Sequence, residues 1–184
     1  MTQPTILVTG ATGSTGGAVV SELLQRGVPV RAMVRSRDAR SAALQARGAE
    51  VIVADIFDPD QLVAAMHGVQ RAYYVPPYHP YVIQCAVTFA VAAREAKLEA
   101  IVQMSQWTSH RNHPALMTRQ TWLMDKMFAE LRGIAHTILN PGLFADDCAL
   151  SISRRCSAFF PYSPASAQWR RSPTRTSRGP RLPC

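Results

Sequence analysis

Gly10-Ala11-Thr12-Gly13-Ser14-Thr15-Gly16 stands near the start of the chain, between the apolar run 6–8 and the helix-like segment 18–26. A strand, a glycine-rich turn and a helix start together form the dinucleotide-binding unit. The free N–H groups and positive dipole end of such a helix attract phosphate. We therefore expect this turn to hold the pyrophosphate of a dinucleotide. The alternative is a purely structural turn between a strand and a helix.

The three glycines of this turn have different expected tasks. Gly10 lets the chain leave the strand in a tight turn, and Gly13 lacks a Cβ where backbone approaches the pyrophosphate. Gly16 lets the first helical turn pack against the strand. The polar residues of the turn also belong to the expected site, and the last two add hydroxyl donors: Thr12, Ser14 and Thr15.

Composition describes an ordinary single-domain protein. The chain has 184 residues, 47% of them hydrophobic, which is enough for a substantial core. It shows neither a signal-peptide pattern nor an apolar run of the roughly 20 residues that span a membrane. None of the cysteines forms a Cys-x-x-Cys pair: Cys85, Cys148, Cys156 and Cys184. We therefore expect a cytoplasmic location, no membrane contact, and neither a disulfide framework nor a metal site.

Strand and helix patterns alternate along the chain. The apolar, non-alternating strand segments are 5–9, 29–34, 50–54, 69–75, 100–104 and 134–139. The helical segments are 14–26, 38–47, 59–66, 81–96 and 117–131. Asp38 and Asp58 are expected N-caps, and Gly27 suits the position after a helix end. Such alternation predicts an α/β fold with a doubly wound, six-stranded parallel sheet of the Rossmann type, in the order 3-2-1-4-5-6.

The end of the second strand bears on which cofactor binds. NAD enzymes commonly carry an acid here for the ribose 2′-hydroxyl, whereas this chain has Arg35-Ser36-Arg37. A guanidinium suits a 2′-phosphate, so Arg35 favours NADP(H) over NAD(H). The alternative is that these arginines are solvated loop charges, and it applies more strongly to Arg37.

Two further strand ends belong to the expected cofactor site. Asp55 can accept a hydrogen bond from the adenine amino group, and Ile56 can cover the ring. An equal alternative is that Asp55 only caps a turn. Where the fourth strand ends, Val75 and Pro76 are expected beside the central riboses, where proline stiffens the loop.

Several of these stretches together resemble the NmrA-like atypical short-chain dehydrogenase/reductases. They are residues 9–16, 30–35, 55, 104–107 and 139–144. The resemblance covers residues 5–147 and implies binding of NADP(H) or NAD(H). Some members of this family reduce small carbonyls or quinones, whereas others are redox-sensing regulators without evident turnover.

The resemblance also leaves the catalytic question open. Active short-chain reductases pair a serine after the fifth strand with a Tyr-x-x-x-Lys on the next helix. Ser105 and Lys126 match that pattern, but Trp122 stands at the tyrosine position, and an indole is not an acid. Lys126 is expected to hold the nicotinamide ribose, or else is a surface lysine. The alternative for Ser105 is a serine that only forms a turn. His110 and His113 are better explained as surface residues than as substrate contacts.

Two functions therefore remain, and a third, weaker interpretation is a fragment without function. The first is an NADP(H)-dependent reductase of a small carbonyl or quinone, in which water or another side chain replaces the tyrosine. The second is a non-catalytic NADP(H) sensor with a regulatory protein partner. Nucleic acid is not an expected partner, because the excess positive charge belongs to the last 37 residues.

The end of the chain breaks the alternating pattern. Residues 148–184 contain seven arginines, seven serines, five prolines and no acid. This composition predicts a disordered basic tail after a nucleotide-binding domain of residues 1–147. The switch resembles GC-rich coding sequence read out of frame. We therefore expect a frameshifted, truncated family member with most of its substrate lobe missing.

Overall fold

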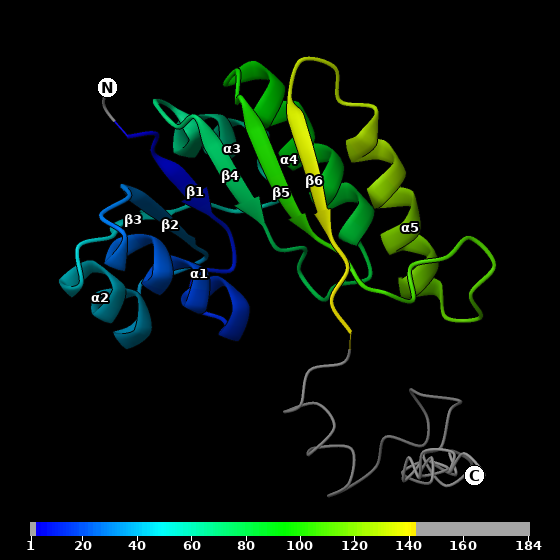
Figure 1. The fold of residues 1–184 in the computed structure, drawn as a ribbon, viewed down its shortest axis with the longest axis horizontal. Helices are drawn as coiled ribbons and strands as arrows, with labels where there is room; N and C mark the ends of the chain where they lie inside the picture. The colour runs from blue at the N-terminus through cyan, green and yellow to red at the C-terminus, as the bar shows by residue number, and fades with distance from the viewer. Residues whose placement is uncertain (1–2, 143–184) are drawn as a thin grey trace, which may run out of the picture. The chain divides into compact units, whose positions relative to one another are not determined.

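In a computed structural model the described residues, 3–142, form a six-stranded parallel sheet with five helices (Figure 1). The strand order is β3-β2-β1-β4-β5-β6, as predicted. The strands are β1 (Ile6–Val8), β2 (Val30–Val34), β3 (Glu50–Val53), β4 (Arg71–Tyr74), β5 (Ala100–Met104) and β6 (Ala135–Leu139). The helices are α1 (Ser14–Gln25), α2 (Ala39–Ala46), α3 (Pro59–Met66), α4 (Val82–Glu95) and α5 (Leu116–Ala129). No helix within the described range is both long and apolar enough to cross a membrane.

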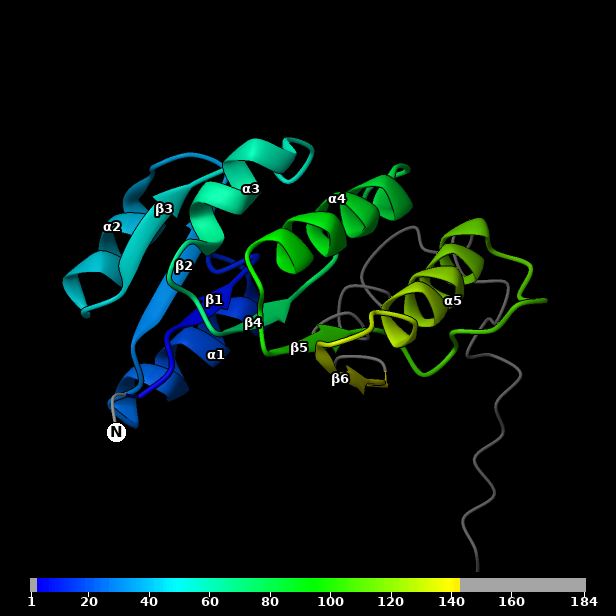
Figure 2. The same ribbon diagram turned by 90° about the horizontal axis from the view of Figure 1, so that it is seen from above.

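Helices cover both faces of the sheet, so successive strand residues enter two different cores. Val8 and Tyr73 pack with α1 and α2 on one face. Leu7 and Tyr74 pack with α3, α4 and α5 on the other. Figure 2 shows α1 on one side of the sheet and α4 and α5 on the opposite side. Double coverage is the reason why these strands are apolar without alternation.

The predicted helix caps are confirmed. Asp38 accepts the Ser41 N–H at 2.9 Å, and the Ser41 hydroxyl accepts the Asp38 N–H at 2.8 Å, which completes a capping box. Hydrogen bonds with Ser41 and Arg40 lower the pKa of Asp38. At α3, Asp58 accepts from the N–H of Gln61, and a proline occupies the first turn.

Helix α4 carries apolar residues on its solvent-facing side as well as on the side that faces the core. Its inner side is buried, with Phe89 at 0% exposure, but Val87 and Val91 are 44% and 43% exposed. The apolar stretch therefore includes a solvent-facing side that composition alone did not distinguish. The predicted boundary after residue 147, the tail of residues 148–184 and the end of the 139–144 motif lie outside the described residues.

Candidate functional site

The glycine turn lies where the order of the sheet reverses. Strand β1 has β2 on one side and β4 on the other, and α1 and α3 lie on opposite faces. In open parallel sheets, ligands bind at the carboxyl ends of strands at this switch point. Gly10 follows β1 with φ +59°, and a Cβ there would lie 3.5 Å from the Cβ of Val75. The turn and the end of β4 are therefore in direct contact.

Close packing inside the turn explains the other two glycines. The Gly13 N–H donates to the Gly10 carbonyl at 2.9 Å, and a Cβ on Gly13 would lie 3.3 Å from that oxygen. A Cβ on Gly16 would lie 2.7 Å from the Gly10 carbonyl carbon and closer still to its oxygen. Gly16 therefore lets the first helical turn approach the backbone at the point where the chain leaves β1.

The first turn of α1 is open to an anion. Its N-cap is Gly13, which provides no side-chain hydrogen bond, and no acidic side chain lies in the first turn. The leading N–H groups of a helix have no partner within the helix, so they are available to a bound phosphate. Around them, Ser14 is exposed, and Thr12 and Thr15 are half-buried. By contrast, aspartates occupy these positions at α2 and α3.

The ends of β1 and β4 are tied together by Thr9, a site residue that the sequence analysis missed. Thr9 is buried, its N–H donates to the Tyr73 carbonyl at 3.0 Å, and its hydroxyl accepts the Val75 N–H at 2.8 Å. Burial raises the pKa of Tyr73, and a hydrogen bond with Thr15 opposes that shift. The sequence feature that could have indicated this role is a hydroxyl-bearing residue directly after an apolar strand.

The two arginines after β2 have different surroundings. Arg37 donates to Gln45 Oε1 at 3.2 Å and to the Val51 carbonyl at 3.3 Å. Arg35 is exposed, and it makes no side-chain hydrogen bond or ion pair with any residue in the range 3–142. Arg35 is therefore the cation of this pair that is free to meet a ligand.

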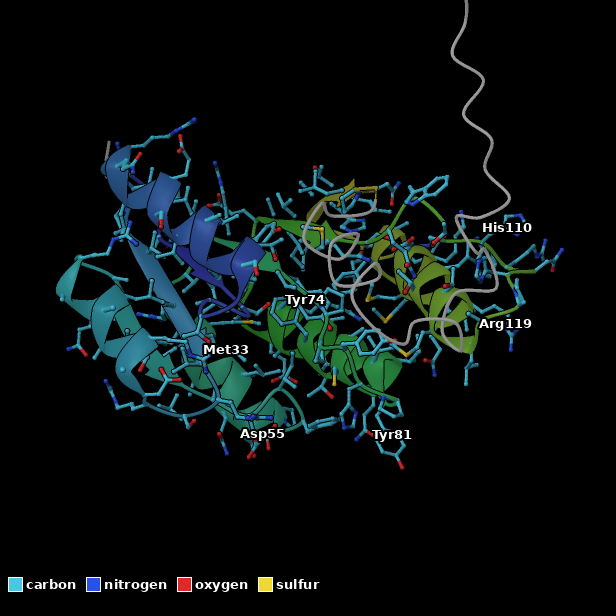
Figure 3. The ribbon with its side chains drawn as sticks, turned by 90° about the horizontal axis from the view of Figure 1, so that it is seen from below. Met33, Asp55, Tyr74, Tyr81, His110 and Arg119 are labelled. Atoms are coloured by element: carbon cyan, nitrogen blue, oxygen red, sulfur yellow. The ribbon has the colours of Figure 1, made fainter. Side chains whose placement is uncertain are left out.

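Asp55 lies at the surface, whereas Met33 and Tyr74 point into the interior (Figure 3). Asp55 Oδ1 accepts the Phe57 N–H at 3.0 Å, so the turn-capping role left open by the sequence is present. Its second carboxylate oxygen has no partner among the described residues. Ile56 is half-buried against the core.

The neighbouring Val75 and Pro76, at the end of β4, are both half-buried. Their loop continues into aromatic packing, because His79 lies 5.4 Å from both the Phe57 and Tyr81 rings. The loops after β3 and β4 therefore pack together at the carboxyl edge of the sheet. Their predicted contacts with adenine and ribose remain predictions.

A buried carboxylate lies beneath the predicted catalytic serine. The Ser105 hydroxyl donates to Asp125 Oδ2 at 2.8 Å, and the Ser109 hydroxyl donates to the same oxygen at 2.7 Å. The Gln103 amide donates to Asp125 Oδ1 at 2.6 Å. Ser105 and Asp125 are each 8% exposed, and Gln103 is completely buried. We call these four residues the Asp125 cluster. A glutamine within the apolar strand β5 was its only sequence signal.

Trp122 and Lys126 lie one helical turn apart on α5. The Lys126 ammonium is 5.8 Å from the centre of the Trp122 ring, and the Arg111 guanidinium is 5.4 Å from it. These are cation–π distances. Lys126 is exposed and follows Asp125 directly, so the two side chains leave the helix about 100° apart. The ribose role of Lys126 stays a prediction.

The two histidines after β5 have local roles. The Nδ1 atoms of His110 and His113 each accept a backbone N–H two residues later, at 3.2 and 3.1 Å. In residues 3–142 no group of three or more potential ligands is placed to hold a metal ion.

Comparison with known proteins agrees with this geometry. The family model described as the NmrA-like family matches residues 2–130. The chain belongs to the NmrA-like family. A curated relative, the NAD(P)H azoreductase of Xenophilus azovorans, is 29% identical over 168 residues, which cover 89% of this NmrA-like chain and 58% of the azoreductase.

Two solved reductase structures share the fold. The triphenylmethane reductase of Citrobacter sp., solved with NADP(H), has a TM-score of 0.70 and 25% identity, over 80% of this chain and 54% of that one. The NADPH-dependent quinone oxidoreductase of Escherichia coli, solved with NADPH, has a TM-score of 0.71 and 28% identity, over 80% and 52%. The NmrA-like chain thus spans about half the length of these relatives.

Proposed function

We propose that this NmrA-like chain binds NADP(H) at the glycine turn and reduces a small carbonyl or quinone. The observation that carries the proposal is the open N-terminus of α1 at the switch point of the sheet. Arg35, which is exposed and has no side-chain partner among residues 3–142, directly follows the adjacent strand β2 and supports NADP(H) in preference to NAD(H). The solved relatives with NADP(H) and NADPH agree with this choice.

Each part of the proposed site has a separate task toward the cofactor. The N–H groups of α1 hold the pyrophosphate, and Arg35 pairs with the 2′-phosphate. Asp55 and Ile56 serve the adenine, and Val75 and Pro76 lie along the riboses. Lys126 holds the nicotinamide ribose. Bound NADPH supplies the hydride.

The missing tyrosine favours a quinone as the substrate. A carbonyl that accepts hydride becomes a strongly basic alkoxide and needs an acid beside it. A reduced quinone oxygen is a weaker base, so water can protonate it without a side-chain acid. Trp122 cannot replace the tyrosine because its indole N–H is a hydrogen-bond donor and not an acid.

A second candidate function is a non-catalytic NADP(H) sensor that acts on a regulatory protein partner. Two observations favour it. Trp122 occupies the tyrosine position, and the hydroxyl hydrogen of Ser105 is already donated to Asp125 instead of to a substrate.

Measurement of NADPH oxidation by the full chain, with a panel of quinones, aldehydes and ketones, separates the two functions. We expect steady turnover with quinones and little with ketones. Binding of NADPH without turnover on any substrate supports the sensor. Absence of both binding and turnover refutes the proposal. The control is Gly13→Val, which should retain the native far-UV circular dichroism but lose NADPH binding.

A further inference from the structure

The hydrogen bonds of the Asp125 cluster all have a defined direction. A carboxylate is only an acceptor, and Asp125 receives one amide hydrogen and two hydroxyl hydrogens. Ser105 has a single hydroxyl hydrogen, and Asp125 takes it. Toward any other neighbour, Ser105 therefore offers only its lone pairs.

The same direction extends to the edge strand of the sheet. Because the Gln103 NH₂ group faces Asp125, its Oε1 faces His136 Nε2 at 2.9 Å. An amide oxygen accepts, so His136 must carry its hydrogen on Nε2. The imidazole is half-buried and stacks on Phe128 with ring centres 5.5 Å apart, which fixes its orientation. The chain of donors therefore runs from His136 through Gln103 to Asp125.

The cluster also anchors the loop that follows β5. Ser109 binds the same carboxylate oxygen as Ser105, four residues later in the loop. Gln106 donates to the Thr121 hydroxyl of α5 at 3.0 Å. Trp107, which is 63% exposed, lies in the loop between Gln106 and Ser109. Asp125 thus connects α5 to the whole first part of this loop.

We propose that Asp125 is a positioning residue that makes Ser105 a hydrogen-bond acceptor toward the nicotinamide half of the cofactor. The Ser105 oxygen accepts a hydrogen bond from an N–H or O–H donor of the cofactor, such as the carboxamide or a ribose hydroxyl. Ser105 consequently does not protonate the substrate. This inference rests on the proposed function, because it assumes that NADP(H) occupies the carboxyl edge of the sheet.

Asp125→Asn tests the direction of these hydrogen bonds. If the Asn oxygen remains with the two serines, its NH₂ group faces the NH₂ group of Gln103. The Gln103 amide must then flip, so that its NH₂ group faces His136 Nε2. His136 can accept that bond only when its hydrogen has moved to Nδ1. The substitution should therefore change the tautomer of a residue that Asp125 does not touch.

Nitrogen NMR of the histidine side chains in the labelled full chain at neutral pH reads this tautomer. We expect Nε2–H in the native protein and Nδ1–H in Asp125→Asn. The matched control, Ser109→Ala, removes one donor but leaves Gln103 in place, so it should keep Nε2–H. Nδ1–H in the native protein would overturn the proposed direction, because the Gln103 NH₂ group would then face His136 and its oxygen would face Asp125.

NADPH affinity tests the positioning role separately. Asp125→Leu removes the acceptor and should lower the affinity about three- to tenfold, the factor for one hydrogen bond, and Asp125→Asn should lose less. If the leucine variant does not keep the native circular dichroism, Ser105→Ala is measured in its place, and we expect the same decrease in NADPH affinity. Full affinity in the folded leucine variant or in Ser105→Ala would overturn the role. Absence of NADPH binding by the native protein would instead refute the proposed function and leave the tautomer result standing.

Discussion

Gly16→Ala, compared with Gly17→Ala, tests whether the turn is as closely packed as the structure shows. A Cβ on Gly16 would lie 2.7 Å from the carbonyl carbon of Gly10, which is backbone and cannot rotate away. A Cβ on Gly17 would have only an ordinary contact, 3.4 Å from the Ala11 carbonyl oxygen. The two glycines are adjacent in the first turns of α1, so each variant adds the same methyl group to the same helix.

The comparison removes the effect of helix propensity from the result. Replacement of glycine by alanine inside a helix is worth up to about 1 kcal/mol of stability, and both variants share this gain. Overpacking of a methyl group costs about 1–3 kcal/mol. We therefore expect Gly16→Ala to have a free energy of unfolding about 1–3 kcal/mol below that of Gly17→Ala. This corresponds to a factor of roughly five to more than a hundred in the unfolding equilibrium.

Denaturant unfolding of the full chain, followed by far-UV circular dichroism, measures this difference. NADPH titration of the same samples should show weaker binding for Gly16→Ala, because relief of the clash displaces the turn that holds the pyrophosphate. Equal stability and equal NADPH affinity for the two variants would refute the close approach of Gly16 to Gly10.

Three further changes give independent tests. Arg35→Ala should lower the affinity for NADPH about tenfold or more and leave the affinity for NADH unchanged. Arg37→Ala should lower the stability of the fold without changing the preference between the two cofactors. Equal losses of affinity for both cofactors in Arg35→Ala would refute the phosphate contact. Thr9→Val should lower the free energy of unfolding by about 1 kcal/mol in denaturant titration, because the N–H of the half-buried Val75 loses its acceptor. Burial lowers the pKa of His136 below its ordinary value of 6.5. As the pH falls, this imidazole therefore binds a proton in the unfolded chain before it does so in the folded chain, and the free energy of unfolding decreases below about pH 6.5. In His136→Phe the free energy of unfolding should decrease less over this pH range. Identical pH profiles of stability in the native protein and the variant would contradict the lowered pKa.

The sequence was informative wherever the deciding signal is local. The glycine turn, the Asp38 and Asp58 caps and the strand segments are each encoded within a few consecutive residues, so their prediction was accurate. The strand order followed because alternation of strands and helices leaves few topologies for a parallel sheet. Arg35 could be singled out because it directly follows a predicted strand.

The missed features depend on side chains that meet only after folding. Asp125 lies 22 residues from Gln103 and 20 from Ser105, and no helix or strand pattern indicates which way its side chain points. Thr9 was visible only as part of a motif, because its partner Val75 is 66 residues away. The tight contact of Gly16 likewise depends on the folded shape of the turn.

Calorimetric titration of the full chain with NADPH and with NADH tests most directly whether the glycine turn and Arg35 form an NADP(H) site. We predict binding of one NADPH per chain, with NADH weaker by about tenfold or more, since only NADPH carries the 2′-phosphate that Arg35 can pair with. A folded chain that gives no binding heat with either cofactor, and no rise in melting temperature at high NADPH, would contradict the site. Binding of NADH as tightly as NADPH would contradict the role of Arg35.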